Sequence, residues 1–215
     1  MSKKKTLLTI LAVMLVCCIA VAGTLAVLFA KTSEPVVNTF TAAGDGKLVT
    51  GEFTLKEHIA AKQTDGSYKL TEETTNDTVK GNHYDVLPRT NLPKDPYITI
   101  TEKTNAPAYL YVEVVGELPT GMHYNMASCW TKLEGVTGNN GGVIYVYNNG
   151  TPIDENSTGL ENIAIIAGNT ITVDDVPGLA EGQKVSLSFY AYLGQASVGT
   201  PSEAYVKCFP TTPAE

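Results

Sequence analysis

Short stretches of alternating apolar and polar residues occur along the second half of the chain and predict β-strands. Residues 97–101 alternate strictly, and one face of residues 185–193 consists of Val185, Leu187, Phe189 and Ala191. Residues 108–115 and 142–147 are more continuously apolar, and we expect 108–115 to be buried on both faces. Many short strands of this kind predict an all-β fold, an antiparallel β-sandwich of jelly-roll type.

The folded domain is expected to span residues 47–209. Its opening strand is placed at 47–55, with a helix over 52–62 as the alternative. The polar residues 64–82 predict an exposed insertion, and residues 210–215 predict a flexible tail. Turn-forming residues separate the expected strands at 64–67, 138–142, 148–150 and 177–178.

The first 30 residues have the pattern of an export signal, which is expected to form a helix. Three lysines at 3–5 precede an uncharged and mostly apolar stretch over residues 7–30. This stretch is also long enough to span a bilayer. An uncleaved, membrane-anchored protein is therefore the alternative to a removable leader.

Small residues at 22–26 favour cleavage by a signal peptidase. The expected signal peptide is 1–26, cut between Ala26 and Val27, with a cut as late as residue 30 as the alternative. The mature chain then begins with an N-terminal segment, 27–46. A cleaved signal peptide predicts a secreted protein that is extracellular or associated with the cell surface.

The charge of the mature chain argues against several partners. Three of the 15 basic residues lie in the leader, so 12 basic and 22 acidic residues remain, a net charge of −10. Nucleic acids and anionic membranes require a basic surface. We expect no nucleic-acid partner, and membrane contact only through the leader before cleavage.

Two cysteines, Cys129 and Cys208, lie beyond the leader. In an exported protein such a pair suggests one disulfide bond. Two free thiols are the alternative, because spacing in the sequence does not show that two cysteines are close in space. The sequence leaves both possibilities open.

Residues that would carry catalysis are scarce. The chain has no Gly-x-Ser-x-Gly elbow, phosphate-binding loop or His-Glu-x-x-His motif. The three histidines are far apart in sequence and could bind a metal only if the fold gathers them: His58, His83 and His123. The acidic pairs at 154–155 and 174–175 could contribute to a calcium site but lack the spacing of a calcium-binding loop. No catalytic residue, metal or cofactor is assigned.

The order of several motifs resembles a known family. Gly-Thr-Leu-Ala at 23–26, followed by Asn-Thr-Phe-Thr at 38–41, resembles the signal class handled by the SipW-type signal peptidase. Further along, the chain is similar to TasA and camelysin at four places: Val-Leu-Pro at 86–88, Pro-Lys-Asp-Pro-Tyr-Ile-Thr-Ile at 93–100, Ala-Tyr-Leu-Tyr-Val-Glu-Val at 108–114 and Leu-Ser-Phe-Tyr-Ala-Tyr-Leu-Gly-Gln-Ala at 187–196. The chain departs from this family at Arg89, where glycine is usual, and at Gly194, where an apolar residue is commoner.

The resemblance implies an exported jelly-roll domain, cut by the dedicated signal peptidase, that assembles into extracellular fibres of a biofilm matrix. Its partners would be further copies of the chain or related matrix proteins. The segment freed by cleavage is a candidate donor strand for the next subunit, because an open sheet edge accepts an added strand. Its apolar residues are Val36, Val37 and Phe40.

Two other function classes stay open from the sequence. Camelysin-like proteins are described as metal-dependent proteases, so the resemblance also implies a possible enzyme. A monomeric surface adhesin would instead use the insertion at 64–82 and the loop at 135–142 as its binding face.

Overall fold

A computed structural model of the chain describes residues 29–31, 51–76 and 80–210. The expected cleavage site at Ala26 and Val27 and the candidate donor residues Val36, Val37 and Phe40 lie outside the described residues. In the described ranges, no helix is long and apolar enough to cross a bilayer.

Antiparallel β-strands and one α-helix form the described part of the chain, so the all-β prediction is confirmed at this level. The strands are β1 (Phe29–Lys31), β2 (Glu52–Lys56), β3 (His58–Lys62), β4 (Tyr68–Thr74), β5 (Asn91–Pro93), β6 (Tyr97–Glu102), β7 (Ala108–Val115), β8 (Met122–His123), β9 (Trp130–Thr137), β10 (Val143–Tyr147), β11 (Ile163–Ala164), β12 (Thr170–Val173) and β13 (Ser188–Gln195). The helix is α2 (Pro201–Cys208), and short 3-10 turns lie at Asn148–Gly150, Ala167–Asn169 and Ala196–Val198.

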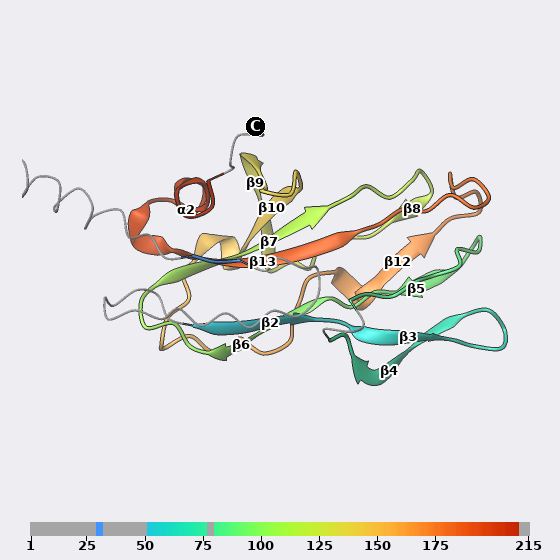
Figure 1. The fold of residues 1–215 in the computed structure, drawn as a ribbon, viewed down its shortest axis with the longest axis horizontal. Coiled ribbons are helices and arrows are strands. Elements are labelled where there is room, and N and C mark those ends of the chain that lie inside the picture. Colours follow the sequence, from blue (N-terminus) through green and yellow to red (C-terminus); the bar gives the residue numbers. More distant parts are fainter. Residues whose placement is uncertain (1–28, 32–50, 77–79, 211–215) are drawn as a thin grey trace, which may run out of the picture.

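The strands are distributed over several small sheets around one larger sheet. The larger sheet has the order β1-β13-β7-β10-β9. Two three-stranded sheets have the orders β11-β6-β2 and β5-β12-β8, and β3 and β4 form a hairpin. In Figure 1, β2 and β6 lie on one side of the β13-β7 pair, and α2 lies on the other side.

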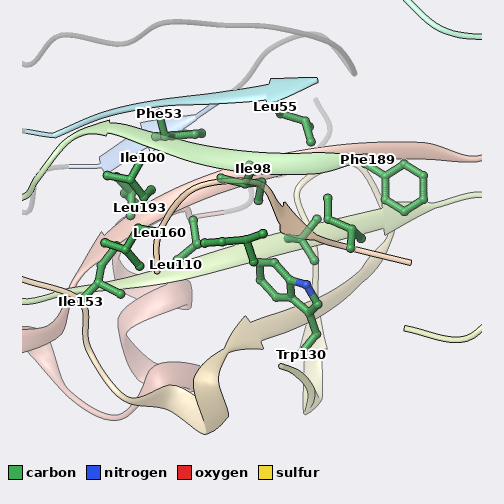
Figure 2. Packing of buried hydrophobic residues seen from close by; sticks show 14 of the residues in the cluster. Phe53, Leu55, Ile98, Ile100, Leu110, Trp130, Ile153, Leu160, Phe189 and Leu193 are labelled. Carbon is green, nitrogen blue, oxygen red and sulfur yellow. The ribbon is translucent and has the colours of Figure 1, made fainter. Parts of the chain in front are cut away.

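The largest hydrophobic cluster fills the space between the five-stranded sheet and the β2-β6 layer. Phe53 and Leu55 of β2 point into it, together with Ile98 of β6, Leu110 of β7 and Phe189 of β13 (Figure 2). All five side chains are at least 97 % buried. Burial of each such side chain contributes about 1.5–3 kcal/mol relative to its exposure. This cluster holds the two layers together.

A second hydrophobic cluster covers the opposite face of the five-stranded sheet. Tyr111 and Tyr192 from the sheet pack edge-on or at a tilt against Tyr205 and Phe209 of the helical segment. Strand β7 is therefore buried on both faces, as the sequence predicts. The sheet approaches the helical segment closely at Gly194, where a Cβ atom would lie 3.1 Å from Tyr111 Cε2 and 3.3 Å from Phe209 Cε2.

Helix α2 begins with a capping box that the sequence reading overlooked. The Thr200 hydroxyl accepts a hydrogen bond from the Glu203 backbone N–H, and the Glu203 carboxylate accepts one from the Thr200 backbone N–H. Pro201 occupies the first turn, where its missing N–H has no intrahelical partner to lose. The sequence Thr-Pro-Ser-Glu at 200–203 carries this signal.

The structure adds detail to three expectations from the sequence. The opening strand placed at 47–55 overlaps β2 (Glu52–Lys56), and the alternative helix over 52–62 does not form, since β2 and β3 pair with different strands. The polar insertion expected at 64–82 contains β4, which pairs with β3. Strand β13 begins at Ser188, so Val185 lies outside it and is 38 % exposed.

We expect Thr200→Ala to destabilise the protein by about 1 kcal/mol, because the N-terminal N–H groups of α2 lose their acceptor. Urea unfolding followed by circular dichroism measures this loss. Ser202→Ala removes a hydroxyl from the same helical turn without touching the capping box and serves as the control. Equal losses in the two variants would contradict the capping role.

Candidate functional site

A group of buried polar side chains lies where two segments pass from one sheet to another. Glu57 separates β2, which pairs with β6, from β3, which pairs with β4. Lys94 follows β5, which pairs with β12, and precedes β6. Regular pairing is interrupted at both positions, and the two side chains meet there.

Lys94 and Glu57 form a buried ion pair. Lys94 Nζ lies 2.5 Å from Glu57 Oε2, and the two residues are 8 % and 3 % exposed. The Lys94 ammonium also lies 5.8 Å from the centre of the Phe189 ring, within range of a cation–π interaction. Each charge has lost most of its hydration and depends on its partner.

Asn82 completes the group from the segment that follows β4. Its Nδ2 donates to Glu57 Oε1 (3.0 Å) and to the His58 carbonyl (2.8 Å). Its Oδ1 accepts from the Ala60 backbone N–H at 2.7 Å. These partners fix the orientation of the amide, because a backbone N–H only donates, whereas a carboxylate or carbonyl only accepts. Glu57 thus binds Lys94 through one oxygen and Asn82 through the other.

A second carboxylate, Asp95, lies next to this group. Asp95 is 5 % exposed and accepts hydrogen bonds from the His58 backbone N–H and ring Nδ1, the latter at 2.6 Å. The His58 ring packs against Tyr97 with ring centroids 5.5 Å apart. Asp95 therefore fixes the first residue of β3 to the start of β6.

A cavity of about 480 Å³ opens onto the ion pair. Its apolar wall includes Leu92, Met122, Ile171, Leu187 and Phe189, while Glu57, Asn82 and Lys94 form its polar part. Tyr84 also lines it and donates a hydrogen bond to the Pro93 carbonyl. Burial, with a further contribution from the Glu57 charge, raises the pKa of Tyr84. The cavity therefore joins an apolar space to a buried amine, amide and carboxylate.

Another buried carboxylate, Glu113, lies at the centre of β7. It is fully buried and accepts hydrogen bonds from the backbone N–H groups of Asn140 and Gly142, from Asn140 Nδ2 and from the Tyr192 hydroxyl. A Cβ atom on Gly138 would lie 2.2 Å from Glu113 Cδ, so a side chain at position 138 would displace the carboxylate. These four donors give Glu113 a structural role in anchoring the loop.

The three histidines do not come together. His58 binds Asp95, His83 is exposed at the cavity rim, and His123 of β8 lies 3.9 Å from Asp174. Among the described residues, no three His, Cys, Asp or Glu side chains converge in an arrangement that could hold a metal ion.

The acidic pairs have local roles. Asp154 Oδ1 accepts hydrogen bonds from the Asn156 backbone N–H and from the Ser157 hydroxyl. Asp175 pairs with the Arg89 guanidinium through both carboxylate oxygens. Arg89 has a φ of 58°, in the left-handed region that favours glycine.

Among the described residues, Cys129 and Cys208 are free thiols. Cys129 packs against the cluster between the sheets, whereas Cys208 belongs to the cluster beneath α2, so the five-stranded sheet separates them. Burial raises the pKa of each thiol and so disfavours the reactive thiolate.

Comparisons with known proteins do not identify the chain. No family model matches it, and no curated protein or solved structure is significantly similar.

We expect Lys94→Met to lower the free energy of unfolding by about 3–5 kcal/mol, because it leaves the Glu57 carboxylate buried without a counter-charge. Urea unfolding measures the change. Lys62→Met is the matched control, since Lys62 also binds a carboxylate, Asp85, but both side chains are more than half exposed. Similar losses in both variants would contradict the importance of burial.

Proposed function

We propose that this chain is an exported structural protein of a bacterial cell surface or biofilm matrix, which assembles into fibres by donating its N-terminal strand. The observation that carries the proposal is the position of β1. This short strand comes from the start of the expected mature chain and occupies the edge of the largest sheet.

Strand β1 continues the sheet through antiparallel backbone pairing. Phe29, Ala30 and Lys31 pair antiparallel with Gly194, Leu193 and Tyr192 of β13. On its other side, β13 pairs with β7 over its full length, from Ser188 to Gln195. The β1 side of β13 is therefore an edge that accepts a separate, short strand.

The same edge can accept the equivalent strand of a second molecule. Backbone hydrogen bonds form in the same way with a strand of the same chain and with a strand of another chain. A three-residue strand at a sheet edge opens at low free energy compared with the enclosed strands. The segment 32–50 between β1 and the rest of the domain has a maximum reach of about 60 Å, long enough to connect neighbouring subunits.

The site of leader cleavage decides whether β1 survives. A cut between Ala26 and Val27 leaves β1 two residues from the new N-terminus. A cut after Ala30 removes two of the three residues of the strand. The proposal therefore requires the earlier cut, and links processing by the signal peptidase to assembly.

We interpret the facing sheets as a jelly-roll β-sandwich, the architecture that the resemblance to TasA and camelysin implies. The antiparallel pairing and the cluster between the layers support this interpretation. Donation in one direction, from each N-terminus to the next β13, would give a head-to-tail filament.

We expect the purified mature protein to form fibres in electron micrographs, and a chain that begins at residue 42 to remain monomeric. The shortened chain lacks β1 and the candidate donor residues but keeps both hydrophobic clusters, so its circular dichroism should show a folded protein. Added to the mature protein, it should shorten the fibres in a dose-dependent manner, because it accepts a strand and donates none.

A mature chain that lacks only residues 211–215 is the control and should form fibres of normal length. Fibres of normal length from the chain that begins at residue 42 would contradict strand donation. The proposal would also fail if the mature protein stayed monomeric at all concentrations.

A further inference from the structure

Glu57 holds a primary amine and a primary amide on its two carboxylate oxygens. Lys94 Nζ lies 2.5 Å from Oε2, and Asn82 Nδ2 lies 3.0 Å from Oε1. An amine and an amide held this way are the reactants of an amide exchange, in which the amine displaces ammonia. The carboxylate between them is in contact with the nitrogen that attacks and with the nitrogen that leaves.

We propose that Lys94 and Asn82 become joined by an intramolecular isopeptide bond, with Glu57 as the proton shuttle. The inference concerns this group alone and does not depend on fibre formation.

Burial prepares the amine for attack. Lys94 and Glu57 are both more than 90 % buried, and desolvation penalises a charged pair more than a neutral one. Transfer of one proton along the hydrogen bond from Nζ to Oε2 converts the pair into a neutral amine and a neutral carboxylic acid. The amine then has the lone pair that nucleophilic attack requires.

The amide is held for attack at its carbonyl carbon. The Ala60 backbone N–H donates to Asn82 Oδ1 at 2.7 Å, which polarises the carbonyl group. The same N–H stabilises the negative charge that forms on this oxygen when the carbon becomes tetrahedral. The bonds from Nδ2 to Glu57 and to the His58 carbonyl fix the plane of the amide.

The reaction balances without a further reactant. The Lys94 nitrogen forms a bond to Asn82 Cγ, the Cγ–Nδ2 bond breaks, and Glu57 carries a proton from the attacking to the leaving nitrogen. The products are one secondary amide and one molecule of ammonia, which the neighbouring cavity of about 480 Å³ can receive. Neither an oxidant nor a metal ion takes part.

The bond would fix the segment after β4 to the residue that precedes β6. It would replace an ion pair that depends on burial with a covalent link. Such a link suits an exported protein whose two cysteines, Cys129 and Cys208, are free thiols on opposite faces of the sheet.

Tryptic peptide mapping of the purified, denatured full-chain protein tests the proposal. Trypsin cleaves after Lys80, Arg89, Lys94 and Lys103, but it cannot cleave after an acylated lysine. The expected product is a branched peptide in which 81–89 is joined to 90–103, with the combined mass reduced by one ammonia. Recovery of only the linear peptides 81–89, 90–94 and 95–103 would overturn the proposal.

Two variants test the assigned roles. Glu57→Gln keeps both reacting groups, and its cross-link should form at least about 100-fold more slowly, because it lacks the proton shuttle. Lys94→Arg keeps the positive charge but not the nucleophilic amine, and it should give only linear peptides. Lys62→Arg is the matched control and should give the branched peptide in full. A cross-link formed at the wild-type rate in Glu57→Gln would overturn the role of Glu57.

Discussion

The pairing of β7 with β13, enclosed on both faces, is the constraint on which the rest of the structure depends. The two strands pair over their full lengths, and both project side chains into two separate hydrophobic clusters. A sheet that is apolar on both faces must be covered twice. The β2-β6 layer covers one face and α2 covers the other.

This double cover explains several features that are otherwise unrelated. Gly194 leaves space for the rings of Tyr111 and Phe209, and Glu113 needs a glycine-rich loop that closes over its carboxylate. Burial, with a further contribution from the hydrogen bond to Glu113, raises the pKa of Tyr192, so that this phenol stays neutral in the folded protein. On this face Glu113, Asn140 and Tyr192 bind one another by hydrogen bonds, whereas the buried Tyr205 hydroxyl has no hydrogen-bond partner among the described residues.

The same constraint separates a long central pairing from a short edge pairing. Eight residue pairs hold β13 to β7, and three hold β1 to β13. Under the proposed strand donation, only the shorter pairing would pass to another molecule. Elsewhere, the Glu57–Lys94–Asn82 group joins the segments where strands change sheets.

Local patterns in the sequence predict the central strands well. Strand β7 lies at the residues expected, and β6 extends one residue beyond the expected 97–101. Both predictions succeed because a continuous apolar run, as in β7, or a strict alternation, as in β6, follows from which faces of the strand are buried. Helix α2 is too short to show a helical period in its apolar residues, although the sequence Thr-Pro-Ser-Glu at 200–203 contains its capping box. The hairpin β3-β4 was missed because polar side chains cover most of β4.

The candidate site was not predictable from the sequence. Glu57, Asn82 and Lys94 come from three separate segments, and each resembles an ordinary surface residue. Only the topology brings them together, at two points where strands pass between sheets. The resemblance to TasA and camelysin includes Lys94 within its Lys-Asp-Pro motif, but it gives no chemical role to this lysine.

Hydrogen exchange in the purified, monomeric mature protein tests the distinction between centre and edge most directly. Amides of β7, and those of β13 bonded to β7, should exchange only through global unfolding, while amides of residues 29–31 should exchange much faster through local opening. Protection of residues 29–31 equal to that of β7 would contradict this distinction, because the strand could then leave its own domain only if the whole domain unfolded.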